Sequence, residues 1–297
     1  MSATISNSNK EASADRELPV RIYGPEKALK HPGVLLKELG SDLWAGRELA
    51  WRLFVRDLKA QYSQTMLGYV WAFLPPLFAS LTFVYLQTQG IIRIEGLGIP
   101  YAAFAMIGTM LWQTFLESMV SPLSSISAAK PMLAKINFPR ESILIAGMYM
   151  VMTSTAIRML LIFGVMLIWG IVPGWSLLLL PIFLFGLMVA GFAIGMGLVP
   201  VGGLYGDVSR AIPMVAQFWM LLTPVVYPAR TDGWAGWLTR WNPIAPLISS
   251  ARSSLTNQPL DNLGLTFGYI VAFSFIAFLG LIAFRLIMPR LIERMGG

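Results

Sequence analysis

The chain has 297 residues, of which 56% are hydrophobic and only 12% are charged, with a mean hydropathy of +0.65 and a net charge of +7. So few charges do not cover an ordinary globular surface, and we expect an integral membrane protein. The chain has no cysteine and one histidine, His31, which excludes disulfides and thiolate metal sites and leaves little for a metal cluster. No nucleic-acid-binding motif accompanies the positive charge, which suits a surface that faces a membrane and a protein partner.

Mainly apolar runs recur at residues 66–86, 101–116, 142–169, 177–201, 211–227 and 263–284. A helix rises about 1.5 Å per residue, so roughly 20 residues cross a hydrocarbon core of about 30 Å. We therefore predict an all-α integral membrane protein with six transmembrane helices. The second run is the shortest, because Glu117 ends it.

The orientation of the spans follows from the basic residues near their ends. If the first loop lies opposite the N-terminal tail, one face carries Arg47, Arg52, Arg56, Lys59, Lys130, Lys135, Arg140, Arg210, Arg285, Arg290 and Arg294, and the other carries Arg93, Arg230, Arg240 and Arg252. Basic residues concentrate on the cytoplasmic side, so we predict that both termini are cytoplasmic. The polar tail does not look like a cleavable signal peptide, and insertion should proceed through the spans themselves.

The segment before the first span divides into two parts. Residues 1–33 show no hydrophobic period, and we expect a mobile or peripheral tail. Residues 34–60 carry apolar residues at helical intervals, which predicts an amphipathic helix in the inner membrane interface, interrupted near Gly40 or Gly46. A small soluble subdomain is the alternative, but so short a segment buries little surface alone.

A short polar break, residues 121–141, separates the second and third runs. It holds Lys130, Lys135 and Arg140, and its Ser, Ala, Leu and Met content favours a short surface helix from about residue 124, with Pro139 ending the segment. We interpret it as a cytoplasmic hairpin that meets a soluble partner. The alternative is an ordinary loop whose charges only fix topology.

Arg158 is the only basic residue well inside an apolar run. An unpaired charge at that depth costs at least about 2.5 to 3.5 kcal/mol. Glu117 is the nearest acid in sequence, but we expect it near the cytoplasmic end of the second span and Arg158 roughly 24 Å into the third, so a direct pair is not expected. Contact with an anionic substrate and a structural role, by hydrogen bonding or snorkelling, both stay open.

Two of the other runs carry further signals. Pro75 and Pro76 predict a kink in the first span. In the fourth span, Gly191, Gly195 and Gly197 give small-residue spacing for close helix contact.

Between the fifth and sixth spans, Trp234, Trp237 and Trp241 recur at intervals of three and four. On a helix they would form one indole face, which prefers the headgroup level. Because Asn242, Pro243 and Pro246 then break and restart the chain, we predict short external re-entrant helices; an aromatic belt alone is the alternative.

Four segments together resemble the membrane subunits of ABC-2 type polysaccharide exporters, which serve O-antigens, capsules and teichoic acids. They are RDLKAQYSQTMLGYVWAFLPP (56–76), KINFPRE (135–141), LLTPVVYP (221–228) and WNPIAPLISSAR (241–252). Their order and spacing cover about residues 47–290. Two positions depart from the family pattern: Pro75 precedes Pro76 where a polar residue is usual, and Gly206 stands where the family has an arginine before Asp207.

The resemblance implies a homodimer of six-span subunits, with residues 61–290 as the transmembrane domain, paired with two copies of a separate ATPase. Residues 124–137 would form the coupling helix, and the helix at 34–60 would help to form the gate where a lipid-linked glycan enters. The coupling candidates are Ser127, Lys130, Met132, Lys135, Asn137 and Arg140; the gate candidates are Arg47, Arg52, Arg56 and Tyr62; and the channel candidates are Tyr69, Trp71, Phe115, Arg158, Trp219 and Tyr227.

Energy must reach this chain from elsewhere. It contains no G-x-x-x-x-G-K-[ST] motif for cradling ATP, so we predict that it is not an enzyme, binds no cofactor, and leaves ATP and magnesium to the partner subunit.

The predicted function is therefore ATP-driven export of a lipid-linked polysaccharide, an O-antigen or similar surface glycan, across the inner membrane. A drug or lipid permease of the same family is the alternative, which the presence of neighbouring glycosyltransferase genes would distinguish. An ion-coupled transporter or membrane enzyme is disfavoured, because the spans offer only Glu117 and Arg158 as ionisable groups and no carboxylate pair. We also find no inverted repeat.

Overall fold

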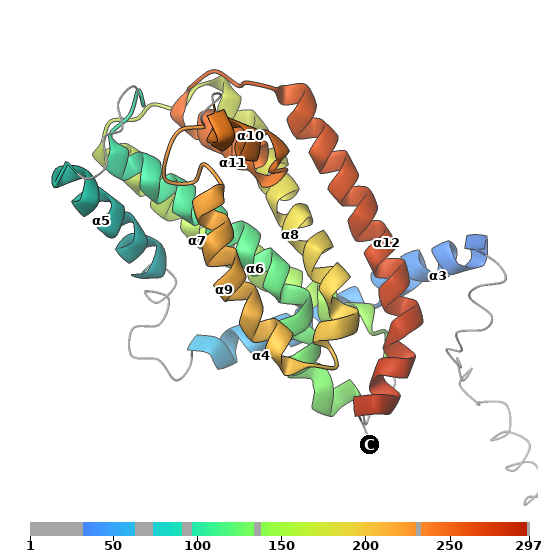
Figure 1. The fold of residues 1–297 in the computed structure, drawn as a ribbon. Helices are drawn as coiled ribbons and strands as arrows, with labels where there is room; N and C mark the ends of the chain where they lie inside the picture. The colour runs from blue at the N-terminus through green and yellow to red at the C-terminus, as the bar shows by residue number, and fades with distance from the viewer. Residues whose placement is uncertain (1–31, 63–73, 91–96, 134–137, 230–232, 296–297) are drawn as a thin grey trace, which may run out of the picture. The chain divides into compact units, whose positions relative to one another are not determined.

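The computed structural model describes residues 32–62, 74–90, 97–133, 138–229 and 233–295 (Figure 1). In these ranges every regular element is helical, which confirms the predicted all-helical class. The chain divides into residues 1–38, of which only the start of α3 is described, and residues 39–297, which hold every feature discussed below.

The helices follow the predicted runs with altered ends. They are α3 (Pro32–Ala45), α4 (Arg47–Tyr62), α5 (Leu74–Thr88), α6 (Tyr101–Leu133), α7 (Glu141–Ile168), the short 3-10 helix η2 (Trp175–Leu179), α8 (Leu180–Gly202), α9 (Gly206–Leu222), α10 (Gly233–Trp241), α11 (Ile244–Thr256) and α12 (Leu263–Met295). In the described ranges three stretches are long and apolar enough to cross a membrane: Glu141–Ile168, Trp175–Gly202 and Leu263–Pro289. The first part of the predicted run at 66–86 lies outside the described residues, and α5 begins within it.

Helix α6 is the central helix of the bundle. It packs against α5, α7, α8, α9 and α11, and 20 of its 33 residues are buried. The predicted span at 101–116 is therefore too short. Glu117 lies at the middle of α6 and not at a membrane edge. A helix surrounded by protein keeps polar residues because its neighbours satisfy their hydrogen bonds, so its hydropathy understates its length.

The predicted separate surface helix from residue 124 is also wrong, because α6 runs without interruption to Leu133 although Pro122 and Pro131 lie inside it. Each internal proline costs about 3 kcal/mol in helix propensity. Buried Leu123, Ile126 and Ala129 continue the packed face of α6, and their burial offsets that cost. The coupling candidates of this segment thus stand on the end of a long buried helix, and residues 134–137 lie outside the described ranges.

Helix α8 packs between α6 and α12 through glycines on one side (Figure 1). A Cβ placed on Gly191 would lie 2.4 Å from the carbonyl oxygen of Phe115, and one on Gly195 would lie 2.2 Å from that of Met119. These two glycines therefore let the backbones of α6 and α8 approach closely, as predicted. Gly197 does not take part, since a Cβ there would meet nothing within 4 Å.

We expect Gly191→Ala and Gly195→Ala to lower the stability of the folded chain by about 1–3 kcal/mol each, because the added methyl group forces the α6 backbone away. Thermal unfolding in detergent, followed by size-exclusion chromatography, measures the effect. Gly197→Ala is the matched control and should keep or raise the unfolding temperature, since alanine is the better helix former and meets nothing there; equal losses in all three variants would contradict the assigned contact.

Two short helices occupy one end of the bundle, and α4 lies toward the opposite end (Figure 1). The first of the two, α10, exposes Trp237 and Trp241, whose ring centroids are 6.3 Å apart. Asn242 separates α10 from α11: its side-chain amide donates to Thr223 Oγ1 at 2.7 Å, and its Oδ1 accepts from the amide of Ile244 at 3.1 Å. Two short helices are thus present here, while their external, re-entrant position stays a prediction.

Arg252 joins the two motif segments that follow α9. Its guanidinium is buried, donates from Nη2 to the carbonyl oxygens of Pro224 (3.2 Å) and Val225 (2.5 Å), and lies 3.8 Å from the centre of the Phe104 ring. Gly108 makes room for this contact, since a Cβ there would meet the Val225 carbonyl oxygen at 2.0 Å. The LLTPVVYP segment is thus bound to both α11 and α6.

Candidate functional site

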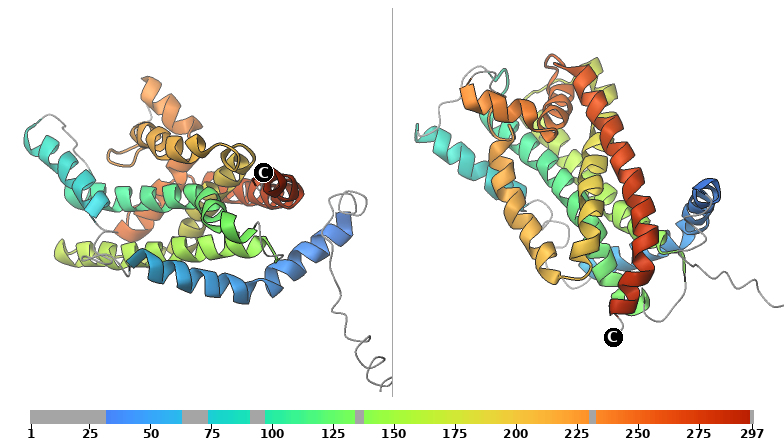
Figure 2. Two further views of the ribbon diagram at one scale, coloured as in Figure 1. Left: turned by 90° about the horizontal axis from the view of Figure 1, so that it is seen from below. Right: turned by 45° about the vertical axis from the view of Figure 1, so that its right-hand side comes forward.

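The first wall of the candidate site is α4, which runs beside α7 (Figure 2). The predicted helix interruption occurs at Gly46, one of the two glycines expected, between α3 and α4. A Cβ on Gly46 would lie 2.4 Å from Ser142 Oγ, so the break fits tightly against the start of α7.

The apolar side of α4, which we predicted to face the membrane interface, packs against other helices of the protein. Ala50, Leu53 and Phe54 are buried, and the Phe54 ring lies 5.8 Å from that of Tyr149 on α7. Trp44 and Trp51, by contrast, are exposed, and such side chains suit a membrane interface.

The three predicted gate arginines all lie on the exposed side of α4. Arg47 stacks 3.8 Å above the Trp44 ring, Arg52 pairs with Glu48 at 2.6 Å, and Arg56 pairs with Asp57 at 2.7 Å. Exposed pairs of this kind contribute little, at most about 1 kcal/mol, so these guanidiniums can exchange their partners for an anion. Tyr62 ends α4, and its side chain lies outside the described ones.

A groove of about 630 Å³ lies between α4, α6 and α7. Small residues such as Ala60, Ala128 and Gly147 line its apolar part. Its polar lining comprises Arg56, Asp57, Gln61, Glu117, Ser121, Ser124, Ser125 and Ser154. The volume falls in the range of small-molecule sites, and the hydroxyl, amide and carboxylate groups suit a ligand with many hydroxyl groups.

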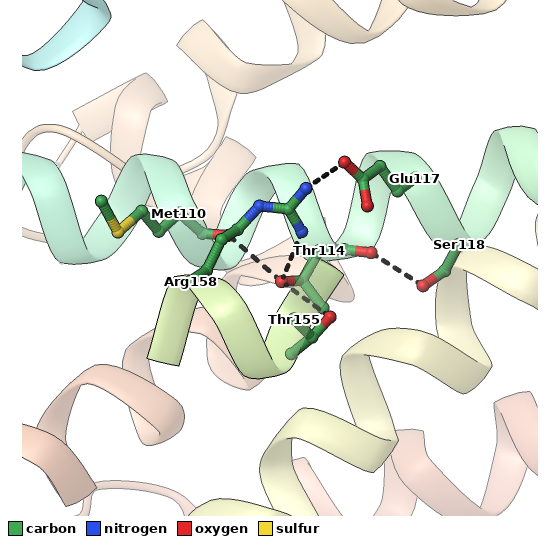
Figure 3. A network of polar contacts seen from close by, with 6 residues as sticks. All are labelled: Met110, Thr114, Glu117, Ser118, Thr155 and Arg158. Carbon is green, nitrogen blue, oxygen red and sulfur yellow. Dashed lines mark hydrogen bonds and ion pairs between the residues drawn. The ribbon is translucent and has the colours of Figure 1, made fainter. Parts of the chain in front are cut away.

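Glu117 forms an ion pair with Arg158 at one side of this groove (Figure 3). The expectation that these two residues would not meet is therefore wrong. It assumed that Glu117 lay at a membrane edge, whereas α6 extends 16 residues beyond it and brings it level with the middle of α7. The arginine side chain is 3% exposed and the glutamate side chain 37% exposed, so only the acid reaches open space.

Threonines complete the environment of Arg158. Its Nη1 donates to Thr114 Oγ1 at 3.4 Å, Thr155 Oγ1 donates to the same oxygen at 3.4 Å, and Thr114 donates to the carbonyl oxygen of Met110 at 3.2 Å (Figure 3). Charge pairing and hydrogen bonding together make a buried guanidinium tolerable at this depth. Within the described ranges no group of three or more His, Cys, Asp or Glu residues could hold a metal ion.

The predicted channel residues do not gather at one place. Phe115 is fully buried, 5.4 Å from the ring of Trp219 and 5.1 Å from that of Trp112, so it packs the α6–α9 contact. Tyr227 donates its hydroxyl to the carbonyl oxygen of Leu221 at 2.8 Å. Tyr69 and Trp71 lie outside the described residues.

Of the coupling candidates, Ser127 and Lys130 are exposed at the end of α6, Met132 is half-buried, and Arg140 stands directly before α7. Lys135 and Asn137 lie outside the described residues.

Sequence reasoning missed a charge cluster made by Asp42, Glu141 and Arg285, which come from α3, α7 and α12. No local sequence pattern could have predicted this cluster, because 243 residues separate Asp42 from Arg285. In the first turn of α9, by contrast, Asp207 and Arg210 form only an exposed pair at 3.7 Å.

Comparison with known proteins decides the family. The sequence model of the ABC-2 type transporter family matches residues 48–256. These residues include nearly all of α4, the groove and the Arg252 contact. The chain belongs to this family. It is 25% identical over 241 residues to the O-antigen export system permease protein RfbA of Klebsiella pneumoniae, covering 80% of this chain and 91% of that protein. It is 26% identical over 216 residues to the protein of the same name from Myxococcus xanthus, covering 70% and 80%.

As an ABC-2 permease, the chain is a membrane-embedded transport subunit, and the ATPase of such a transporter is a separate subunit. The groove, the Glu117–Arg158 pair and the exposed end of α6 all lie inside the matched residues, so they are parts of the transport domain.

Proposed function

We propose that this ABC-2 permease exports a lipid-linked polysaccharide, an O-antigen or similar surface glycan, across the inner membrane. The observation that carries the proposal is the similarity to O-antigen export permeases over most of the chain. The groove supports it, because hydroxyl and carboxylate groups beside a basic helix suit a sugar carried on an anionic lipid head.

The substrate enters from the inner leaflet at α4. Arg47, Arg52 and Arg56 contact the anionic head, and Trp44 and Trp51 hold the helix at the interface. Their exposure supports this role. The sugar chain then passes beside α6. Trp219 and Tyr227 line the conduit together with Tyr69 and Trp71, and the buried Phe115 supports Trp219 from behind.

In the proposed topology the chain crosses the membrane six times, and both of its termini lie in the cytoplasm. The successive α6, α7, α8 and α9 run in alternating directions in Figure 1, which supports this arrangement. It gathers Arg56, Lys130 and Arg210 on one side, as the distribution of basic residues in membrane proteins requires.

Two copies of this chain form the conduit and bind two ABC ATPase subunits through the end of α6, with Ser127, Lys130 and Met132 at the contact. The exposure of Ser127 and Lys130 supports this contact. Lys135, Asn137 and Arg140 extend it, and ATP and magnesium stay on the partner. Because the native chain has no cysteine, disulfide cross-linking of single-cysteine variants tests the dimer, and recovery of active monomers alone would contradict it.

The proposal is tested by deleting the gene and following the glycan. Loss of the surface glycan, with accumulation of its lipid-linked form in the inner membrane and recovery by the intact gene, is the expected result. Normal surface glycan after deletion would overturn it.

The basic face of α4 gives a sharper prediction. Replacing Arg47, Arg52 and Arg56 by Gln should reduce export about tenfold or more at normal protein level, since each arginine near anionic lipid contributes about 1 kcal/mol. The exposed Arg240 on α10 is the matched control, and Arg240→Gln should export normally. If the triple variant exports like the parent, α4 serves only as an anchor.

A further inference from the structure

The chain leaves α9 through a buried break, at the end of the bundle where α10 and α11 lie (Figure 1). Helix α9 ends at Leu222 because Thr223 precedes Pro224 and takes an extended conformation, with φ −105° and ψ 139°. The last carbonyl groups of a helix lose their usual partners at such a point, and a membrane protein has little water there to replace them. Side chains must therefore supply the missing donors.

The hydroxyl group of Thr223 joins the last turn of α9 to the start of α11. Its Oγ1 donates to the carbonyl oxygen of Trp219 at 2.8 Å and accepts from the side-chain amide of Asn242 at 2.7 Å. Asn242 is fixed in turn, because its Oδ1 accepts from the backbone amide of Ile244 at 3.1 Å. One hydroxyl group thus connects two helices.

Arg252 of α11 holds the two carbonyl groups that follow Thr223. Its Nη2 donates to the oxygens of Pro224 and Val225, and the residue is only 4% exposed. No described carboxylate pairs with it, so these oxygens beside the negative end of the α9 dipole, together with the Phe104 ring, compensate its charge. Without the guanidinium, two buried carbonyl groups would lack this donor.

The position of α9 depends on these contacts, because packing within the chain holds the helix only lightly. Ile212 and Ala216 are the only buried residues among its 17, whereas 10 of the 13 residues of α11 are buried. Helix α11 is therefore a firm base for the end of α9. The last turn before the break begins at Trp219, whose ring lies 6.1 Å from that of Trp112.

We propose that Arg252 and Asn242 are positioning residues that hold the end of α9 on α11 and so fix the place of Trp219 in the conduit. The inference rests on the proposed function, which puts Trp219 beside the passing glycan. Entry at α4 is a separate step, because α4 packs against α7 and these contacts lie on α9 and α11. Loss of the contacts should therefore slow passage and leave entry unchanged.

The test uses the complete transporter, permease with ATPase, in proteoliposomes. The probe is the lipid extract of the gene-deletion strain, in which the lipid-linked glycan accumulates, diluted in steps with phospholipid. ATP hydrolysis per folded transporter gives the maximal rate and the amount of extract that half-saturates it. A loss of stability alone changes neither quantity, because it only lowers the amount of folded transporter recovered.

Thr223→Val is the decisive variant. It keeps the shape of the side chain but removes the hydroxyl group that joins Trp219 to Asn242. We expect the maximal rate to fall about fivefold or more, the lower end of ordinary coupling between sites, at an unchanged half-saturating amount. Thr223→Ser keeps the hydroxyl group and should behave like the parent.

Arg252→Met removes the other attachment. It should lower the unfolding temperature and also the maximal rate per folded transporter. Because only Nη2 makes the two carbonyl bonds, one ammonium group can replace it, and Arg252→Lys should recover most of the rate. Arg240→Gln, an exposed change on α10, should alter neither quantity.

Unchanged maximal rates in Thr223→Val and Arg252→Met would overturn the inference. A raised half-saturating amount at an unchanged maximal rate would overturn it too, because it would assign these residues to entry. Failure of both variants to fold would show that the contacts serve stability only. If the extract does not stimulate the parent beyond phospholipid alone, the proposed function is overturned instead.

Discussion

Glu117→Gln should destabilise the chain by about 3–5 kcal/mol, because it leaves the Arg158 guanidinium charged, buried and without its counter-ion. The glutamine amide oxygen can still accept a hydrogen bond from the guanidinium, but neither it nor Thr114, 3.4 Å from Arg158 Nη1, supplies a negative charge. The measurements are the yield of folded protein after detergent extraction and its unfolding temperature. Arg158→Met should cost less, since the Glu117 side chain that it leaves behind reaches the groove.

The double variant Glu117→Met/Arg158→Met distinguishes the two roles left open for Arg158. Replacing a buried ion pair by apolar residues of similar size is often neutral, so the double variant should fold like the parent. We expect it also to export normally, because Arg158 is enclosed between α6 and α7 and makes contacts within the protein. Glu117 lines the groove, so a folded double variant that fails to export would assign the Glu117–Arg158 pair, and not Arg158 alone, to the substrate path.

Ala129→Pro should abolish export and co-purification with the ATPase while the spans stay inserted. A proline there removes a helical hydrogen bond and clashes with the preceding turn, at a cost of about 3 kcal/mol. Pro131 already weakens the last turn of α6, so a second proline at 129 detaches residues that the packing of Ala129 and Leu133 now holds. Export in cells and affinity co-purification measure the result.

Matched variants show whether the helix or its charges matter. Ala129→Gly keeps the backbone donor and should cost only about 1 kcal/mol. Reversing Lys130 and Lys135 to Glu changes charge without removing a backbone hydrogen bond, and should be less damaging than the proline. If Ala129→Pro binds the ATPase and exports like the parent, the end of α6 only sets topology and does not bind the ATPase.

The amino-acid pattern alone determined the membrane class, the helical fold, the family motifs and several breaks. Gly46 interrupts the helix predicted at 34–60, and Asn242 and Pro243 separate two short helices, as predicted. These features depend on local chemistry: hydrophobic content, glycine and proline conformations, and residues spaced at helical intervals.

Only the tertiary structure decided how far α6 extends and which charges meet. Hydropathy predicted that the second span ends at Glu117, because a charged side chain is costly in lipid. Inside the bundle that cost disappears, since Arg158 on a neighbouring helix supplies the opposite charge and the surrounding helices replace the lipid. The cluster of Asp42, Glu141 and Arg285 depends in the same way on contacts between distant segments, which neighbouring residues in the sequence do not encode.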